Sequence, residues 1–363
     1  VTPGVTLNDN VLEQKENNFL ASVHLTTGIS GIALLDISTG EFYLAEGNIE
    51  YIDKLLQSFS PSEVVIQRQN RGKFIELFGD NSYMSFFDDW VFSIDFAKEL
   101  LLKHFNTTSL KGFGVESIVN GIIAAGAALH YLFETHHNKL DHINKIQRID
   151  EGKFVWLDKF TIRNLELLYP LSHGATTLLD IIDKTDSPMG ARLMRRWVSL
   201  PLKDIQTINE RLNIVEYLMK EESLSNSIHT QIKKIGDLER LISKVVTSRV
   251  NPRELKQLQR ALVATSSLKN SLKETGRLEL SQIAEKLNPC HSLVIKLKTE
   301  LNDEPPTSIN KGSVIANGVS KELDDLRKIS TSGKDFLREI VTREIENTGI
   351  SSLKIGFNNV FGY

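Results

Sequence analysis

The stretch DIIDKTDSPMGARLMRRWVSLPL, residues 180–202, holds the clearest local signals in the chain. Ser187 is suited to cap the free N–H groups of a first helical turn. Pro188 suits the first helical position, because its missing N–H has no partner to lose there. Pro201 ends the helix, since a proline ring cannot continue one. The stretch therefore predicts a helix over residues 188–200.

The predicted helix has two chemically different sides. At about 100° per residue, one side carries the apolar residues Met189, Leu193, Trp197 and Leu200, and the other carries Arg192, Arg195 and Arg196. An amphipathic helix of this kind packs its apolar side and leaves its basic side in water. We expect that arrangement here, with direct contact between the arginines and DNA phosphates as the alternative.

The first third of the chain alternates strands with helices. The segments FLASVHL, GIALLDI and EFYLAEG alternate well enough to be strands joined by short turns. They are followed by an amphipathic helix at 49–59, a strand at 63–67, a helix near 73–78 and a strand around 83–87. A three-stranded meander followed by this alternation predicts an α/β layered domain.

After about residue 110 the pattern is helical throughout. Helices are expected at residues 118–134, 204–220, 253–268 and about 320–347. The last of these would be roughly 40 Å long at 1.5 Å per residue. The patterns divide the chain into an α/β domain at 1–112 (with 1–14 linker-like), an all-α domain with a long helical arm at 113–349, and a strand segment at 350–363.

Composition limits the class of protein. The 363 residues are 40% hydrophobic and 25% charged, as in folded multidomain proteins. No apolar run reaches the ~20 residues that span a bilayer, and a single cysteine, Cys290, fits a reducing cytosol. Residues 1–110 carry 7 Lys or Arg against 15 Asp or Glu, whereas the remainder carries 36 against 31. This asymmetry places any DNA-binding surface outside the first third.

Motifs for metal or nucleotide chemistry are sparse. No phosphate-binding G-x-x-x-x-G-K-[ST] loop occurs. Four histidines, His130, His136, His137 and His142, lie close in sequence; a metal pair is one interpretation, and packing or surface histidines are the other.

Asp36, on the second strand of the meander, raises the possibility of a nuclease. Two-metal phosphoryl chemistry needs three or four converging carboxylates, and the only candidate companions of Asp36 are Glu63, Asp88 and Asp89. We expect Asp36 to cap its turn instead, and we keep a metal-dependent nuclease as the alternative.

Several blocks, in order, resemble the MutS family of DNA mismatch-repair proteins. They are GEFYLAEG (40–47), KFVWLDKFTIRNLELL (153–168), LLDIIDKTDSPMGARLMRRWVSLPL (178–202) with INERLNIVEYL (208–218), GDLERLISKVVTSRVNPRELKQLQRAL (236–262) and GISSLKIGFNNVFGY (349–363). By this resemblance the α/β domain is the connector, with a ribonuclease-H-like fold that does not act as a nuclease. The helical domain is the lever, and the last residues begin the DNA clamp.

The resemblance also implies roles for particular residues. Arg192, Arg195 and Arg196 would form interhelical salt bridges around a core centred on Trp197, making a structural hub of the lever. In the terminal segment, alternation places Lys354 and Asn358 on one side of a strand, where they suit contact with the DNA backbone.

The resemblance further implies that the chain is a non-catalytic piece of a longer sensor, without the mismatch-reading and ATPase domains. No catalytic, cofactor or metal residues are then expected here, while the full-length protein would use ATP and Mg²⁺. The expected partners are duplex DNA, a MutL-type protein on the connector and a second copy of the protein, in the bacterial cytoplasm at the nucleoid. A helical scaffold unrelated to DNA stays open as a further alternative.

Overall fold

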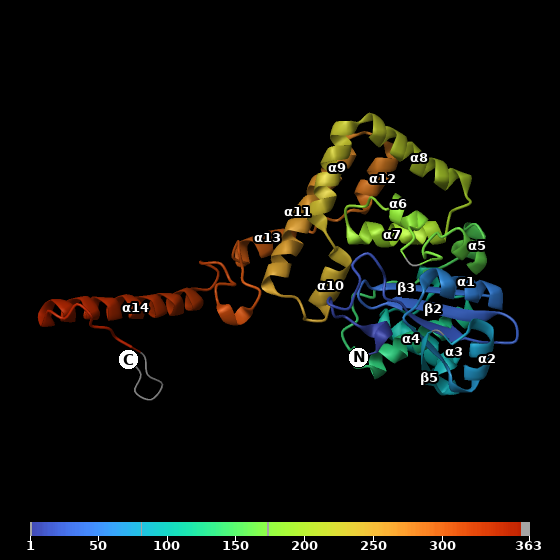
Figure 1. Cartoon of the computed structure of the whole chain (residues 1–363), viewed down its shortest axis with the longest axis horizontal. Helices are drawn as coiled ribbons and strands as arrows, with labels where there is room; N and C mark the ends of the chain where they lie inside the picture. Colours follow the sequence, from blue (N-terminus) through green and yellow to red (C-terminus); the bar gives the residue numbers. More distant parts are fainter. Residues whose placement is uncertain (1, 81, 173, 357–363) are drawn as a thin grey trace. The chain divides into compact units, whose positions relative to one another are not determined.

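The computed structural model describes residues 2–80, 82–172 and 174–356. The chain divides into two compact units (Figure 1): Val1–Val250 with Gln257–His291, and Asn251–Lys256 with Ser292–Tyr363. Within the described ranges, no helix is both long and apolar enough to cross a membrane. The first unit holds the α/β domain and most of the helices.

A six-stranded mixed sheet forms the centre of the α/β domain. Its strands are β1 (Leu20–His24), β2 (Ser30–Asp36), β3 (Glu41–Gly47), β4 (Glu63–Gln67), β5 (Tyr83–Phe87) and β6 (Gln147–Arg148), in the spatial order β5-β4-β1-β2-β3-β6. Strands β1, β2 and β3 form the antiparallel meander that the sequence predicts. Strand β4 adds in parallel beside β1, and β5 adds in parallel beside β4. The two-residue β6, parallel to β3, is too short to give a sequence signal.

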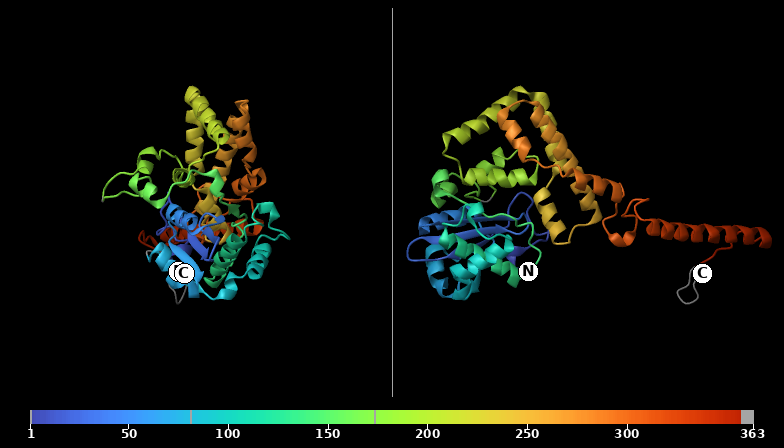
Figure 2. Two further views of the ribbon diagram at one scale, coloured as in Figure 1. Left: turned by 90° about the vertical axis from the view of Figure 1, so that its right-hand side faces the viewer. Right: turned by 180° about the vertical axis from the view of Figure 1, so that it is seen from behind.

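Helices cover both faces of this sheet (Figure 2). Helices α1 (Ile49–Phe59) and α2 (Arg71–Phe78) pack on one face, and α3 (Ile94–His104) and α4 (Val119–Glu134) on the other. Successive residues of a strand point to opposite faces. In β2, accordingly, Ile32 and Leu34 join the core under α1, while Ala33 and Leu35 join the core under α4.

Helix α4 belongs to the α/β domain, although the sequence pattern predicts it as part of the helical domain. Its alanines at 124, 125, 127 and 128 are fully buried in the core against the sheet. Small side chains allow this close approach, since a Cβ on Gly31 of β2 would lie 2.0 Å from the carbonyl oxygen of Asn120. The boundary expected between residues 112 and 113 therefore falls inside this domain. The change from strand pattern to helix pattern in the sequence corresponds to the last helix that covers the sheet, and not to a domain boundary.

Eight further helices follow along the chain, and all of them lie wholly or mostly in the first unit. They are α5 (Lys159–Asn164), α6 (Leu178–Ile182), α7 (Pro188–Ser199), α8 (Ile205–Lys220), α9 (Glu222–Ile235), α10 (Leu238–Val246), α11 (Pro252–Glu274) and α12 (Leu278–Lys286). A small core of their own joins Ile235, Leu268, Leu272 and Leu280. The helices expected at 204–220 and 253–268 are confirmed by α8 and α11.

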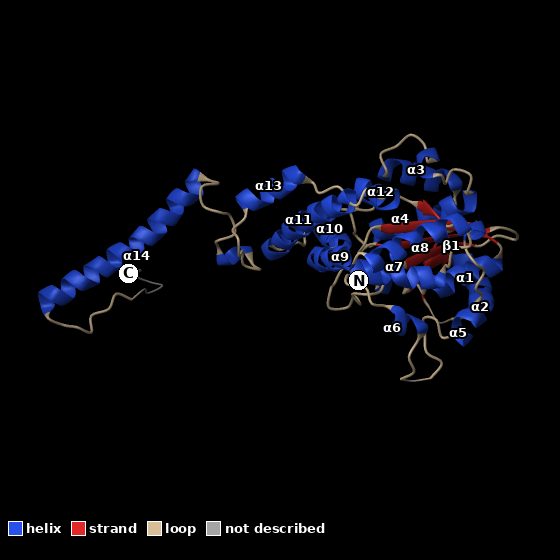
Figure 3. Cartoon of the chain, turned by 90° about the horizontal axis from the view of Figure 1, so that it is seen from above, coloured by secondary structure: helices blue, strands red, loops and turns tan. Residues whose placement is uncertain are grey.

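The second unit contains α13 (His291–Glu300) and the long helix α14 (Lys321–Thr348). The 28 residues of α14 form one continuous helix (Figure 3), as the sequence predicts, and Gly333 does not break it. The strand expected after it is not seen in the part that the structure describes, because residues 353–356 have no strand pairing. The rest of that expected strand lies outside the described residues.

The contact between α3 and α4 provides a test of this packing. A Cβ added to Gly126 of α4 would lie 2.4 Å from the Cβ of Ala97 of α3, so Gly126→Ala forces two helices apart. We expect the free energy of unfolding to fall by about 1–3 kcal/mol, as for other overpacked cores. Urea denaturation followed by circular dichroism measures this change.

Gly72→Ala in α2 is the matched control, because an added Cβ there meets nothing within 4 Å. Alanine is the better helix former, so this variant should be as stable as the parent or slightly more stable. Equal stability of the two variants would contradict the packing described.

Candidate functional site

Helix α7 begins and ends as its sequence predicts. The Ser187 side chain accepts a hydrogen bond from the N–H of Gly190 at 3.1 Å, Pro188 opens the helix, and the helix ends at Ser199 before Pro201. Three arginines leave this helix in different directions and reach three other parts of the first unit. Together with their partners they form what we call the arginine hub.

Arg192 is the buried centre of the hub, with 2% of the residue exposed. Its Nη1 and Nη2 donate to the two carboxylate oxygens of Asp237, both at 2.8 Å, and Nη2 also donates to Glu239 at 2.7 Å. Nη1 donates in addition to the carbonyl oxygen of Gln14 at 3.0 Å. The paired fork of a guanidinium on a carboxylate is the strongest geometry available to an ion pair.

The titration of these groups follows from their burial. Burial alone lowers the pKa of Arg192, but the hydrogen bonds and charges of Asp237 and Glu239 outweigh it and raise that pKa. Burial raises the pKa of Glu239, against the opposing influence of Arg192. Arg192 therefore stays charged, and its carboxylates are the partners that make this buried charge tolerable.

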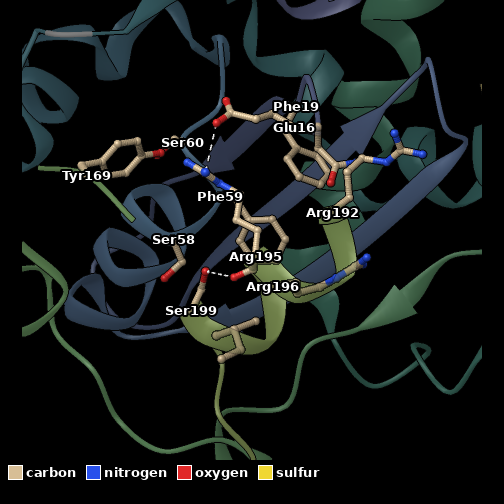
Figure 4. A pocket seen from close by; sticks show the side chains of 12 residues that line it. Glu16, Phe19, Ser58, Phe59, Ser60, Tyr169, Arg192, Arg195, Arg196 and Ser199 are labelled. Atoms are coloured by element: carbon tan, nitrogen blue, oxygen red, sulfur yellow. Dashed lines mark hydrogen bonds and ion pairs between the residues drawn. The ribbon is translucent and has the colours of Figure 1, made fainter. Parts of the chain in front are cut away.

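Arg195 reaches Glu16 in the N-terminal segment (Figure 4), and Arg196 reaches the sheet. Arg195 pairs with Glu16 at 3.0 Å, and its guanidinium lies 5.1 Å from the ring centre of Tyr169. Arg196 pairs with Glu41, the first residue of β3, at 2.7 Å. The salt bridges expected between helices are thus, for these two arginines, contacts to the N-terminal segment and to β3. The pocket between them, about 50 Å³, has room for only a few water molecules.

Trp197 does not occupy the centre of a core. It is 41% exposed, Leu193 is 40% exposed, and both line an open cleft of about 660 Å³. The guanidinium of Arg211 lies over the Trp197 ring, 3.6 Å from its centre. The expectation that the apolar side of the helix is packed and the basic side solvated is therefore wrong for Arg192. The partly exposed carboxylates of Asp237, the N-cap of α10, and of Glu239 on α10 pair with Arg192, so the helix packs at this arginine.

The first residues of the chain, expected to be linker-like, are packed between the sheet and the helices. We call residues 2–18 the N-terminal strap. Val5 and Leu12 of the strap are buried, with 1% and 9% exposed. On the sheet side, the N–H of Gly4 donates to Glu63 at 2.9 Å and the amide of Asn17 donates to Asp36 at 2.8 Å.

On the helical side, cations from α7, α10 and the residues after α10 bind the strap. Its carbonyl oxygens accept from Arg192, Arg240 and Arg249, and its Asp9 pairs with Lys244. A true linker exposes its backbone to water, whereas the strap carbonyls are satisfied by side chains distant in sequence. Sequence reasoning missed Asp237, Glu239, Glu16 and Glu41, since nothing local marks a carboxylate whose partner is so far along the chain.

Asp36 caps its turn, as expected. It is fully buried, and its carboxylate accepts from the N–H and hydroxyl of Ser38, from the Asn17 amide and from the N–H of Asn18. Its proposed companions have partners of their own: Glu63 bonds to Gly4, Ser85 and Tyr131, Asp88 pairs with Arg68, and Asp89 accepts from Gln67. Nothing in this arrangement supports the nuclease alternative.

The four histidines do not share one site. His130 lies among the rings of Phe87, Trp90 and Phe96. The Nε2 of His142 bonds to the carbonyl oxygen of Ile37 at 2.8 Å, and burial lowers the pKa of His142. Among residues 2–80, 82–172 and 174–356, no three His, Cys, Asp or Glu residues are grouped to hold a metal ion.

The terminal residues named from the sequence are only partly visible. Lys354 is exposed, at the end of the described chain. Asn358 lies outside the described residues. Their expected pairing on one face of a strand stays a prediction.

The hub predicts unequal costs for two substitutions on one helix. Arg192→Met leaves Asp237, whose side chain is 19% exposed, without its buried cation. Such broken pairs cost about 3–5 kcal/mol. Arg195→Met removes a pair whose Glu16 side chain is 50% exposed, which is worth about 0–1 kcal/mol. The midpoints of urea denaturation should differ accordingly, and equal midpoints would show that Arg192 does not hold the hub together.

Two protein-family models match the chain. The model of MutS domain II matches residues 18–144, and the model of MutS domain III matches residues 160–354. The domain II match includes α4, in agreement with its packing on the sheet. The ion pair between Arg196 and Glu41 joins one matched segment to the other.

Relatives named DNA mismatch repair protein MutS are similar over the whole chain. The protein of Flavobacterium johnsoniae and that of Bacteroides thetaiotaomicron are each 53% identical over 363 residues, and that of Parabacteroides distasonis is 52% identical. The chain spans 42% of the length of each of these relatives. With the domain III match covering more than half of it, the chain belongs to the MutS family of DNA mismatch repair proteins.

Proposed function

We propose that this chain is the connector and lever part of a mismatch-repair sensor and that it couples DNA engagement to an ATPase elsewhere in the full-length protein. The observation that carries the proposal is the ion pair between Arg196 and Glu41, because it joins the domain II segment to the domain III segment. A signal that moves helices of the lever is then transmitted to the sheet without a flexible linker.

The partners follow from the same assignment. The full-length protein would bind mismatched duplex DNA as a dimer in the cytoplasm, at the nucleoid. It would use ATP and Mg²⁺ through a separate domain, so that this part is a non-enzymatic coupler. The ribonuclease-H-like assignment of the sheet is supported by its three-strand meander and by the parallel strands beside β1.

A MutL-type partner would dock on the α/β domain. The excess of 15 acidic over 7 basic residues in positions 1–110 disfavours DNA phosphates on this domain and suits a protein partner. Trp90 and Tyr83 are exposed on it, at 56% and 55%. Exposed aromatic side chains of this kind are common anchors of protein interfaces.

A charge exchange in the complete protein tests the coupling role. Arg196→Glu places a negative charge beside Glu41 and should separate the lever from the sheet. Mismatch binding and basal ATP hydrolysis should persist, while ATP-induced release from a mismatched duplex slows. Combining Arg196→Glu with Glu41→Arg restores the opposite charges and should recover release. Stopped-flow fluorescence with a labelled duplex measures the release rate.

Normal release in the Arg196→Glu protein would contradict a coupling role for this contact. Failure of the double exchange to recover release, with both single variants folded, would do so too, because the pair would then not act through its charges. Arg195→Glu is the matched control on the same helix, since its partner Glu16 is half exposed.

DNA contact near the end of the chain would be independent of sequence. Lys354 is exposed beyond the end of α14, and a lysine reads the phosphate backbone and not the bases. In the complete protein, Lys354→Ala should weaken binding of matched and mismatched duplexes alike and lower the salt slope by about one ion. Fluorescence anisotropy across a salt series measures both. Unchanged affinity at every salt concentration would remove Lys354 from the DNA surface.

A further inference from the structure

Another cavity in the first unit lies away from the arginine hub. It has a volume of about 580 Å³ and lies where three segments meet: residues 5–8 of the strap, the residues after α4 and the residues after α10. The side chains that matter are those of Asn8, His136, His137, Lys139, Thr247 and Arg249. Two of these residues, His136 and His137, belong to the group of four histidines noted in the sequence, and neither is part of the arginine hub.

The charge of this cavity is one-sided. Lys139 and Arg249 line it, and no Asp or Glu does. Both cations are held by neutral partners: Lys139 Nζ donates to the Ser248 hydroxyl at 2.8 Å, and Arg249 Nη1 donates to the Leu7 carbonyl oxygen at 2.8 Å. Both cations are exposed and each has one such hydrogen bond, while no described carboxylate lies within ion-pair distance of either. This contrasts with Arg192, Arg195 and Arg196, each of which has a carboxylate.

Hydrogen-bond donors complete the lining. Asn8 offers its side-chain amide, and His136 is exposed in the same lining. The Thr247 hydroxyl also lines the cavity but donates to the carbonyl oxygen of Ser243 at 2.8 Å, so it can only accept there. Burial lowers the pKa of His137, and the positive charge of Arg249 lowers it further. His137 is therefore neutral at neutral pH and acts as a hydrogen-bond group in a positive field.

Helix ends explain only part of this arrangement. Cations after α4 and α10 offset the partial negative charge of the two helix C-termini. The helix-end effect does not require the two cations to line one cavity. It also does not account for the strap carbonyl oxygen that accepts from the guanidinium of Arg249, or for a lining without carboxylates. A guanidinium and an ammonium facing one open space are the groups that proteins use for phosphate, the first as a planar fork and the second as a point charge.

We propose that this cavity is a binding site for a phosphate group, held by Lys139 and Arg249. Its volume exceeds that of a single phosphate, so a phosphate ester with its sugar also fits. Two ligands supply such a phosphate group: free phosphate, or a nucleic-acid strand through its backbone. The proposal does not depend on the coupling role of the hub, because no residue of the hub lines this cavity.

The experiment uses the chain as it stands. Isothermal titration calorimetry measures the binding of inorganic phosphate, and separately of a twelve-nucleotide oligothymidine, at a constant ionic strength set with chloride. We expect inorganic phosphate to bind the parent chain. The variant Lys139→Gln with Arg249→Gln should bind it at least about tenfold more weakly, which is the loss of one charge-assisted contact or more.

Lys145→Gln is the matched control. Lys145 is exposed a few residues beyond Lys139, has no carboxylate partner among the described residues and lies outside this cavity. Its affinity for phosphate should stay within about twofold of the parent. If the double variant is unfolded by circular dichroism, Lys139→Gln alone replaces it, since among the described residues it removes only the hydrogen bond to the Ser248 hydroxyl.

The outcomes separate the two sources. Binding of oligothymidine that weakens with that of phosphate identifies a nucleic-acid phosphate. Oligothymidine binding that is absent, or unchanged in the variants while phosphate binding falls, identifies free phosphate or a monoester. No heat of phosphate binding above the chloride background, or equal affinity in the parent and the variants, would overturn the proposal.

Discussion

The contact on which the first unit depends is the buried guanidinium of Arg192 between Asp237 and Glu239. A charge with 1% of its side chain exposed is tolerable only with such partners, so the position of α7 against α10 is set by the ion pair. The same guanidinium also bonds to the strap at Gln14. One side chain thus fixes two helices and the N-terminal segment together.

Helices α7 and α10 contact the sheet and the strap through several charged and polar groups. Arg196 meets Glu41, Arg195 meets Glu16, and Arg240 meets the Glu16 carbonyl oxygen. Polar contacts between domains of one chain resemble transient interfaces, which permit relative motion more readily than an apolar core does. A coupling element needs this property, because it must change its arrangement when a distant site changes. The strap limits that motion by holding to both sides.

Much of the fold followed from local pattern. Ser187 and Pro188 define the start of α7, and the alternation in β1, β2 and β3 predicts the meander. Local pattern does not say which side of an amphipathic helix is buried when a carboxylate partner comes from far away. Arg192 and Asp237 are 45 residues apart, and Arg196 and Glu41 are 155 apart. The strap escaped prediction for the same reason. Helix α8 was expected from its sequence, yet its Ile205 and Met219 are 73% and 80% exposed.

Native-state hydrogen exchange tests the central claim most directly, namely that Arg192 holds the strap, α7 and α10 as one unit. In the Arg192→Met chain, amides of residues 2–18, α7 and α10 should lose protection together and by a similar free energy, as a single cooperative unit does. Strands β1, β2 and β4 should keep theirs, because their cores lie under α1 and α4. Unchanged protection of the strap in that variant, or loss confined to α7, would contradict the account.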